Sequence, residues 1–191
     1  METIKYFTSN ELQSLFKACI SDSSKHSLRN LCLLKVAFYC GLRASELGLI
    51  NVDDYNSSNR SIYCRRLKGS NNNTVRLDVE TSRLLNKYIK EYKLSPGDLM
   101  FASQHKKPIS RQTLDVIIKN YCKLAKIKDY TKHHFHVLKH TRAVSMLEAG
   151  FTLEDIQYVL GHKNISNTSI YAQFSSNYKR YLFDKMDRIK Y

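Results

Sequence analysis

The sequence predicts a mainly α fold of the α+β class, in which a bundle of helices carries one small antiparallel sheet. Most of the chain has apolar residues at the three- and four-residue spacing of amphipathic helices. Two β-type runs in the first half flank a polar loop. Because 42% of the 191 residues are hydrophobic, we expect one ordered domain with a real core, alone or with a tail.

Three helices are predicted before the sheet, at Thr8–Ala18, Leu28–Cys40 and Ala44–Ile50. Thr8 can cap the first of them, and Glu11 would complete a capping box. Gly41 suits the left-handed position that ends the second helix. Because the third helix follows at once, Arg43 is expected at a tight corner between two helices.

The sheet is predicted from the runs Ser61–Leu67 and Thr74–Val79. Residues 68–73, Lys-Gly-Ser-Asn-Asn-Asn, form a loop of turn-favouring residues between them. An antiparallel hairpin with Lys68 at its tip follows from this pattern. Leu99–Ala102 is a further candidate for a short strand.

The rest of the chain is predicted to be helical. Helices are expected at Glu80–Lys93, Arg111–Ile127, Phe135–Glu148 and Thr152–Leu160, and from Ser166 through Tyr171. After Ser175, an apolar stripe is formed by Tyr178, Leu182, Met186 and Ile189. This tail can fold back on its own domain or dock on a neighbouring subunit, and the sequence leaves both possibilities open.

Positive charge is the main functional signal in the composition. The formal net charge is +14, and residues 101–150 carry ten Lys/Arg against three Asp/Glu. Residues 60–68 add four cations and no acid. Clustered cations over a foldable core are typical of proteins that bind the phosphate backbone of nucleic acids. A basic surface without a nucleic-acid role remains the alternative.

Composition also argues against membrane, secreted and disulfide-rich classes. No apolar run approaches the roughly 18 residues of a membrane span, and Met1–Lys5 does not resemble a signal peptide. We therefore expect a soluble, cytoplasmic protein. The cysteines are odd in number and scattered without a CxxC pair: Cys19, Cys32, Cys40, Cys64 and Cys122. Reduced thiols, several of them buried, fit this spacing better than a disulfide framework or a zinc site.

Three side chains with possible chemistry share one face of the predicted helix 135–148. His136, Lys139 and His140 are spaced i, i+3, i+4. Zinc ligation is disfavoured, because no glutamate follows His136 as in HExxH and a lysine occupies the same face. A hydrogen-bonded core histidine is the favoured interpretation of His140, and phosphate binding is the third possibility. Two-metal phosphodiester chemistry needs grouped carboxylates, which the sequence lacks, so we expect no metal or other cofactor.

At this point the sequence resembles a family. The pieces His136-Val-Leu-Lys-His-Thr, Leu160-Gly-His162 and Ile170-Tyr171 are similar to the signature of the tyrosine recombinases, the phage-integrase family. Upstream, Gly41-Leu-Arg43-Ala-Ser-Glu46 resembles the first arginine motif, Lys68-Gly69 the lysine loop, and Phe7–Glu11 the usual opening of the catalytic domain. The resemblance covers essentially the whole chain and implies a catalytic-domain-like helical bundle with a three-stranded antiparallel sheet.

The resemblance assigns roles to individual residues. Tyr171 would be the nucleophile, leaving a 3′-phosphotyrosyl link that stores the phosphodiester energy without ATP or metal. Arg43 would clamp the nonbridging oxygens of the phosphate, since a guanidinium offers bidentate donors. His136 and His162 would donate hydrogen bonds to that phosphate or assist proton transfer from the phenol. Lys68 would protonate the leaving 5′-oxygen.

Other residues would act from beside the reacting atoms or on the DNA backbone. Glu46 would support Arg43, and His140 would lie next to the site. The predicted DNA contacts are Arg65, Arg66, Arg111, Lys119 and Arg142. Together these roles imply site-specific DNA recombination (integration, excision or inversion) by a dimer or tetramer assembled on double-stranded DNA. A catalytically impaired DNA-binding regulator and a relaxing type IB topoisomerase remain the alternatives.

Two departures from the family pattern qualify this expectation. The fourth residue of the family's HxxR motif is Lys139, which keeps the charge but loses the planar fork. We expect no DNA-clamping domain before the predicted catalytic domain, residues 1–175, so the chain resembles in size the fimbrial phase-switch invertases, or is a truncated copy. Residues 176–191 are expected to form a helical tail that docks in trans.

Overall fold

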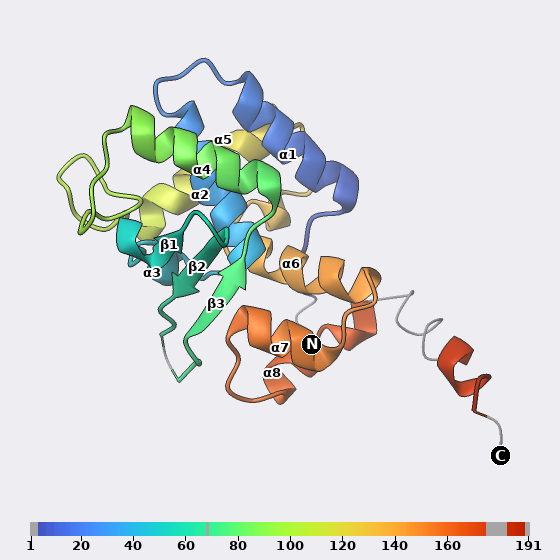
Figure 1. The fold of residues 1–191 in the computed structure, drawn as a ribbon. Coiled ribbons are helices and arrows are strands. Elements are labelled where there is room, and N and C mark those ends of the chain that lie inside the picture. Colours follow the sequence, from blue (N-terminus) through green and yellow to red (C-terminus); the bar gives the residue numbers. More distant parts are fainter. Residues whose placement is uncertain (1–3, 68, 175–182, 190–191) are drawn as a thin grey trace.

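The computed structural model describes residues 4–67, 69–174 and 183–189, in which eight labelled α-helices pack with one small sheet at their edge, and residues 183–186 add a short helical turn (Figure 1). The helices are α1 (Ser9–Ser21), α2 (Ser27–Cys40), α3 (Ala44–Leu47), α4 (Val79–Glu91), α5 (Arg111–Leu124), α6 (Val137–Glu148), α7 (Leu153–Leu160) and α8 (Ser166–Ser169). Short 3-10 turns lie at Val52–Asp54, Tyr130–Lys132 and Ala172–Phe174. The predicted mainly α fold with a small antiparallel sheet is confirmed.

The sheet has three strands in the order β1 (Tyr55–Asn56), β2 (Ser61–Cys64) and β3 (Asn73–Arg76), all antiparallel. In its register, Ile62 lies opposite Tyr55 on one side and Val75 on the other. β2 and β3 form the predicted hairpin, although both are shorter than the sequence suggested.

The prediction of a strand at Leu99–Ala102 was wrong. Met100 and Phe101 are fully buried, but Leu99 and Ala102 make only isolated bridges, to Asn51 and Pro108. The apolar run therefore reflects burial in the core, without a neighbouring strand to pair with.

Helix α2 is the central element, and its position fixes that of Arg43. It packs against α1, α4 and α6, with Leu33, Leu34 and Val36 fully buried (Figure 1). Gly41 ends it in the left-handed conformation (φ +57°), and its N–H donates to the carbonyls of Ala37 and Phe38. The chain then turns directly into α3, as predicted.

The last three helices form a separate layer with its own apolar cluster. Ala143, Leu147, Ile156, Leu160 and Tyr171 pack together there. The sequence predicted a helix continuing through Tyr171, which was wrong. α8 ends at Ser169, so Tyr171 lies in the turn that follows. Its side chain points into the cluster and is only 2% exposed.

The tail is described only at residues 183–189, which Figure 1 shows apart from the helical body. Of the predicted stripe, Tyr178 and Leu182 lie outside the described residues. Met186 and Ile189 are more than half exposed, as is Phe183. All five cysteines are free and buried. Within the described ranges, no helix has the length and apolar character needed to cross a bilayer.

Candidate active site

Arg43 presents one edge of its guanidinium outward from the α2–α3 corner. Its backbone N–H and Nη1 donate to the two carboxylate oxygens of Glu46, at 2.9 and 2.7 Å. Nη1 also donates to Ser70 Oγ at 3.1 Å, on the loop of the hairpin. Among the described residues, no hydrogen bond occupies Nη2, and 37% of the side chain is exposed. This edge can therefore bind an anion from outside.

Glu46 is a fully buried carboxylate that holds the base of this site together. Burial would raise its pKa, but the N–H groups of Arg43 and the charges of Lys139 and Arg66 hold it below the ordinary value. Glu46 is therefore ionised at neutral pH and fixes Arg43 in place. The sequence predicted this supporting role only through the family resemblance.

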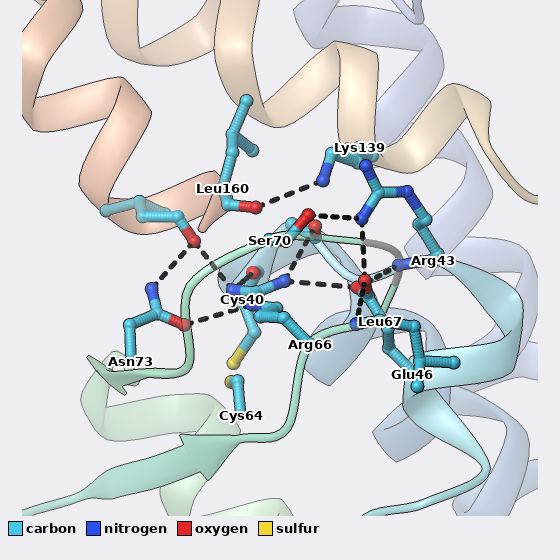
Figure 2. A network of polar contacts seen from close by, with 12 residues as sticks. Cys40, Arg43, Glu46, Cys64, Arg66, Leu67, Ser70, Asn73, Lys139 and Leu160 are labelled. Carbon is cyan, nitrogen blue, oxygen red and sulfur yellow. Dashed lines mark hydrogen bonds and ion pairs between the residues drawn. The ribbon is translucent and has the colours of Figure 1, made fainter. Parts of the chain in front are cut away.

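Lys139 is 6% exposed and lies in α6, next to Arg43 (Figure 2). Its Nζ donates to the carbonyl of Leu160, at 3.1 Å, at the end of α7. Burial and the charges of Arg43 and Arg66 lower the pKa of Lys139 to about 7, although Glu46 acts in the opposite direction. This lysine is thus only partly charged at neutral pH, unlike an arginine at the same position.

Arg66 is the central donor of the network in Figure 2, and its side chain has no exposed surface. Its guanidinium donates to Asn73 Oδ1, Gly41 O, Glu46 Oε2, Cys40 O and Val159 O, at 2.7–3.3 Å. It was predicted to contact DNA. Because every donor faces the interior, the structure gives it an internal role in place of that surface role.

His162 follows Gly161, which ends α7 in the left-handed conformation (φ +66°). Its Nδ1 lies 3.0 Å from Thr168 Oγ1, so α8 orients the ring. Burial and the charges of Lys139, Arg43 and Arg66 lower the pKa of His162 to about 4. The imidazole is therefore neutral at pH 7 and can donate from Nε2 if Nδ1 accepts from the threonine.

Tyr171 and His140 form a direct pair, with the phenol oxygen 2.9 Å from His140 Nδ1. Burial raises the pKa of Tyr171 to about 12, although the charge of Arg43 acts against this. Burial and the charges of His136 and Lys139 lower the pKa of His140 to about 4. His140 is therefore a neutral base in contact with the phenol. The sequence predicted it beside the site but not this contact.

His136 is exposed at the start of α6 and contacts two other imidazoles. Its ring stacks on His134, with centroids 5.7 Å apart, and meets His140 edge-on at 5.5 Å. Burial of part of the ring, with the charge of His134, lowers the pKa of His136. Over the described ranges, no three His, Cys, Asp or Glu side chains gather as a possible metal site.

Of the predicted site residues, Arg43 at the α2–α3 corner lies beside the α6–α7–α8 layer, which carries Lys139, His140, His162 and Tyr171. A guanidinium edge, a buried ammonium, two neutral imidazoles and a phenol are the groups that a phosphoryl transfer through tyrosine requires. Lys68 lies outside the described residues, although Ser70, two residues later in the same loop, contacts Arg43.

Residues 5–177 match a protein family described as the phage integrase family. The chain belongs to this family. The candidate site residues described above lie within that match, as does the hairpin. Family membership predicted from motifs is therefore confirmed.

Individual relatives agree with this family membership. The chain is 31% identical over 180 residues to a tyrosine recombinase of Pseudothermotoga lettingae, a match that covers 94% of this chain and 59% of that protein. It is 30% identical to the type 1 fimbriae regulatory protein FimB of Escherichia coli K12, over 87% of this chain and 83% of FimB. The chain therefore spans less than two thirds of the recombinase but most of FimB, whose size it resembles as predicted.

Solved structures share the fold. The crystal structure of XerA recombinase aligns with a TM-score of 0.79 at 26% identity, over 97% of this chain and 66% of that chain. XerH recombinase bound to its palindromic difH substrate aligns with a TM-score of 0.81 at 22% identity, over 97% and 54% of the two chains.

The other predicted DNA contacts of this integrase-family chain differ in exposure. Arg111 and Lys119 are exposed on α5. Arg65 is partly exposed, is paired with Asp54 and lies over the ring of Tyr63. Arg142 packs between Phe38 and Tyr39, and its buried Nε has no hydrogen bond.

Sequence reasoning missed the partners that hold the catalytic groups in place. Ser70 lies in the hairpin loop and Asn73 begins β3, in a segment whose composition indicated only a turn. His134 precedes the motif and gives no signal of its own. The contact of Thr168 with His162 did not follow from sequence spacing.

Proposed function

We propose that this protein is a site-specific DNA recombinase that cleaves and rejoins strands through a 3′-phosphotyrosyl intermediate. The hydrogen-bond distance between Tyr171 and His140 carries this proposal, because it pairs a nucleophile with a neutral base. The open edge of Arg43, 37% exposed and close to this pair, adds the anion-binding group that the transition state needs.

In the proposed reaction, the Tyr171 oxygen attacks a DNA phosphorus and its proton passes to His140. Arg43, protonated Lys139 and His162 bind the nonbridging oxygens, on which charge grows in the transition state. The 5′-oxygen leaves and takes a proton, a step for which Lys68 remains the proposed donor. Because a phosphodiester bond is exchanged for another of similar energy, attack by a new 5′-hydroxyl reverses the step and joins strands without an energy source. We propose that no metal or other cofactor takes part.

We further propose that double-stranded DNA is the partner and that several copies assemble on it. XerH is named as bound to its palindromic difH substrate, which supports a comparable DNA partner here. The exposed apolar residues Phe183, Met186 and Ile189 would dock on a neighbouring copy, with residues 1–175 forming the catalytic domain. The protein would act in the cytoplasm, on the nucleoid when bound to DNA. If deletion of residues 176–191 left assembly on DNA and recombination intact, the tail proposal would be wrong.

A covalent-adduct assay tests the central proposal. The protein would be incubated with a pool of nicked duplexes of random sequence, and denaturing gels would separate protein linked to DNA from free protein. Wild type should give a linked band that Tyr171→Phe lacks. Tyr130→Phe changes an exposed tyrosine and should keep the band. A band that persists in Tyr171→Phe would reassign the nucleophile.

The same assay separates the two alternative functions. Absence of an adduct with wild type, while DNA binding persists, would favour a DNA-binding regulator. The replacement of the motif arginine by Lys139 is the observation that keeps this candidate open. Relaxation of any supercoiled plasmid, without a preferred cleavage sequence among the adducts, would favour a type IB topoisomerase activity.

A further inference from the structure

Arg66 uses the whole hydrogen-bonding capacity of its guanidinium inside the protein. A guanidinium has five N–H donors. Nε donates to Asn73, Nη1 to the Gly41 carbonyl and Glu46, and Nη2 to the carbonyls of Cys40 and Val159. The side chain has no exposed surface, so no donor remains for a ligand.

The acceptors belong to the segments that carry the catalytic groups. The carbonyls of Cys40 and Gly41 lie at the end of α2, three and two residues before Arg43. The carbonyl of Val159 lies in the last turn of α7, three residues before His162. Helix ends present carbonyls without intrahelical partners and carry partial negative charge, so a cation satisfies both needs at once.

Arg66 also joins these helix ends to the hairpin. It follows β2, and its backbone N–H donates to Asn72 in the loop. Asn73 accepts from Nε and donates to the carbonyls of Tyr158 and Val159, at 2.5 and 3.2 Å. In the same loop, the Asn71 N–H donates to the Gly161 carbonyl at 2.9 Å. The hairpin is thereby bonded to the end of α7.

Gly161 makes the close approach of Arg66 possible. A Cβ at this position would lie 2.8 Å from Arg66 Nε and 2.8 Å from the Asn71 carbonyl oxygen. Its φ of +66° also favours glycine. Both features apply at the residue directly before His162.

We propose that Arg66 is a positioning residue for DNA cleavage, which sets the relative position of Arg43, His162 and the hairpin by binding the ends of α2 and α7 together with Glu46. This inference rests on the proposed function but assigns a role to a residue that does not touch the substrate. A lysine cannot replace it, since an ammonium has three donors on one atom and cannot reach acceptors arranged around a planar fork.

The test compares Arg66→Lys with wild type at saturating nicked DNA. Arg66→Lys keeps the charge, so DNA affinity should change less than twofold while the cleavage rate falls by about ten- to a hundredfold. Lys35→Met is the matched control. It alters a different buried cation of the core, one paired with Glu80 at 3.0 Å on α4, away from the site. Its cleavage rate per folded molecule should stay within twofold of wild type.

A second measurement reports position without any reaction. Burial keeps the pKa of His162 at about 4, so loosening of the α7 end should raise its NMR titration midpoint in Arg66→Lys and not in Lys35→Met. If Arg66→Lys fails to fold, Asn73→Ala removes only the acceptor of Nε and the bonds to α7. It should slow cleavage by about three- to tenfold and raise the titration midpoint of His162 as Arg66→Lys does.

The outcomes separate the two proposals. Wild-type protein that forms no adduct would refute the recombinase function, whatever His162 does. The positioning role alone would be refuted if wild type forms an adduct, Arg66→Lys or Asn73→Ala cleaves at the same rate, and the titration midpoint of His162 is unchanged. If Arg66→Lys and Lys35→Met have the same thermal stability and lose the same cleavage rate, Arg66 contributes only to folding in general.

Discussion

The pKa of Lys139, about 7, leads to a sharp prediction about pH. In the proposed reaction the protonated form supplies the charge that binds the phosphate, so cleavage should slow as pH rises through this value. About nine tenths of the lysine is protonated at pH 6 and about one tenth at pH 8. If only the charged form is active, the second-order rate constant for cleavage should fall by roughly tenfold over this range.

The sign of this effect separates Lys139 from the other groups at the site. His140 and His162, with pKa values of about 4, do not change charge between pH 6 and 8. Tyr171, with a pKa of about 12, stays protonated, and any need to remove its proton would make cleavage faster at higher pH. A falling rate that Lys139→Arg abolishes therefore points to the ammonium.

The assay is single-turnover cleavage of nicked DNA with protein in excess, at subsaturating concentration so that the free protein's pKa governs the rate. Lys139→Arg should remove the fall between pH 6 and 8, because a guanidinium stays charged. At saturating protein the fall in cleavage rate should occur at higher pH, since a bound phosphate favours the charged lysine. A rate that is flat or rising from pH 6 to 8 in wild type would refute the reasoning.

Folding stability should change in the opposite direction, which excludes unfolding as the cause of the slower cleavage. Burial lowers the folded-state pKa of Lys139 below that of the unfolded chain, so the unfolded state binds more protons above pH 7. This group then adds stability as pH rises, by roughly 1 kcal/mol per pH unit. Urea unfolding at pH 7 and 8 should show this gain in wild type and lose it in Lys139→Arg.

Three further predictions concern the frame of the site and the DNA surface. Glu46→Gln should lower the free energy of unfolding by about 3 kcal/mol and move the fall in cleavage rate to lower pH, because Glu46 raises the pKa of Lys139. Glu80→Gln changes a carboxylate that is itself exposed and should do neither, as urea melts and pH profiles will show. Gly161→Ala should lower the free energy of unfolding, measured in urea melts, by about 2 kcal/mol more than Gly150→Ala does. Both glycines have positive φ, but only Gly161 has close neighbours, so equal losses of stability would contradict the contact argument. Arg111→Ala should reduce the slope of log affinity against log salt by about 1 in DNA-binding titrations, and an unchanged slope would remove Arg111 from the DNA surface.

Local patterns in the sequence predicted most of the fold. The capping box at Thr8 and the glycines that end α2 and α7 marked helix limits because these signals act within a few residues. The run Leu99–Ala102 failed because a strand needs a partner, and pairing depends on residues far away in sequence. The helix predicted to include Tyr171 ends before it. This limit was not predictable because α8 has four residues, too few to show a periodic pattern.

The site was predictable only as far as the family resemblance reached. Arg66 illustrates the limit, because it lies in a basic run and local charge indicated the surface. Its burial depends on Cys40 and Val159, which lie 26 and 93 residues away in sequence. A sequence pattern that spans a few residues cannot indicate a hydrogen-bond acceptor so far away in the sequence. The exposed Arg111 behaved as its charge suggested, because its neighbours on α5 are solvent-facing.

The presence of Arg66 next to the site gives a physical reason why position 139 holds a lysine and not the arginine of the family motif. Two guanidiniums already share the single buried carboxylate of Glu46, so a third permanent cation there would be costly to desolvate. A lysine avoids part of that cost, because it can lose its proton in the free protein. Under the proposed function it would regain the proton when a phosphate binds, so its charge would depend on the substrate. Arg43, with its exposed edge, then provides the fork that Lys139 lacks.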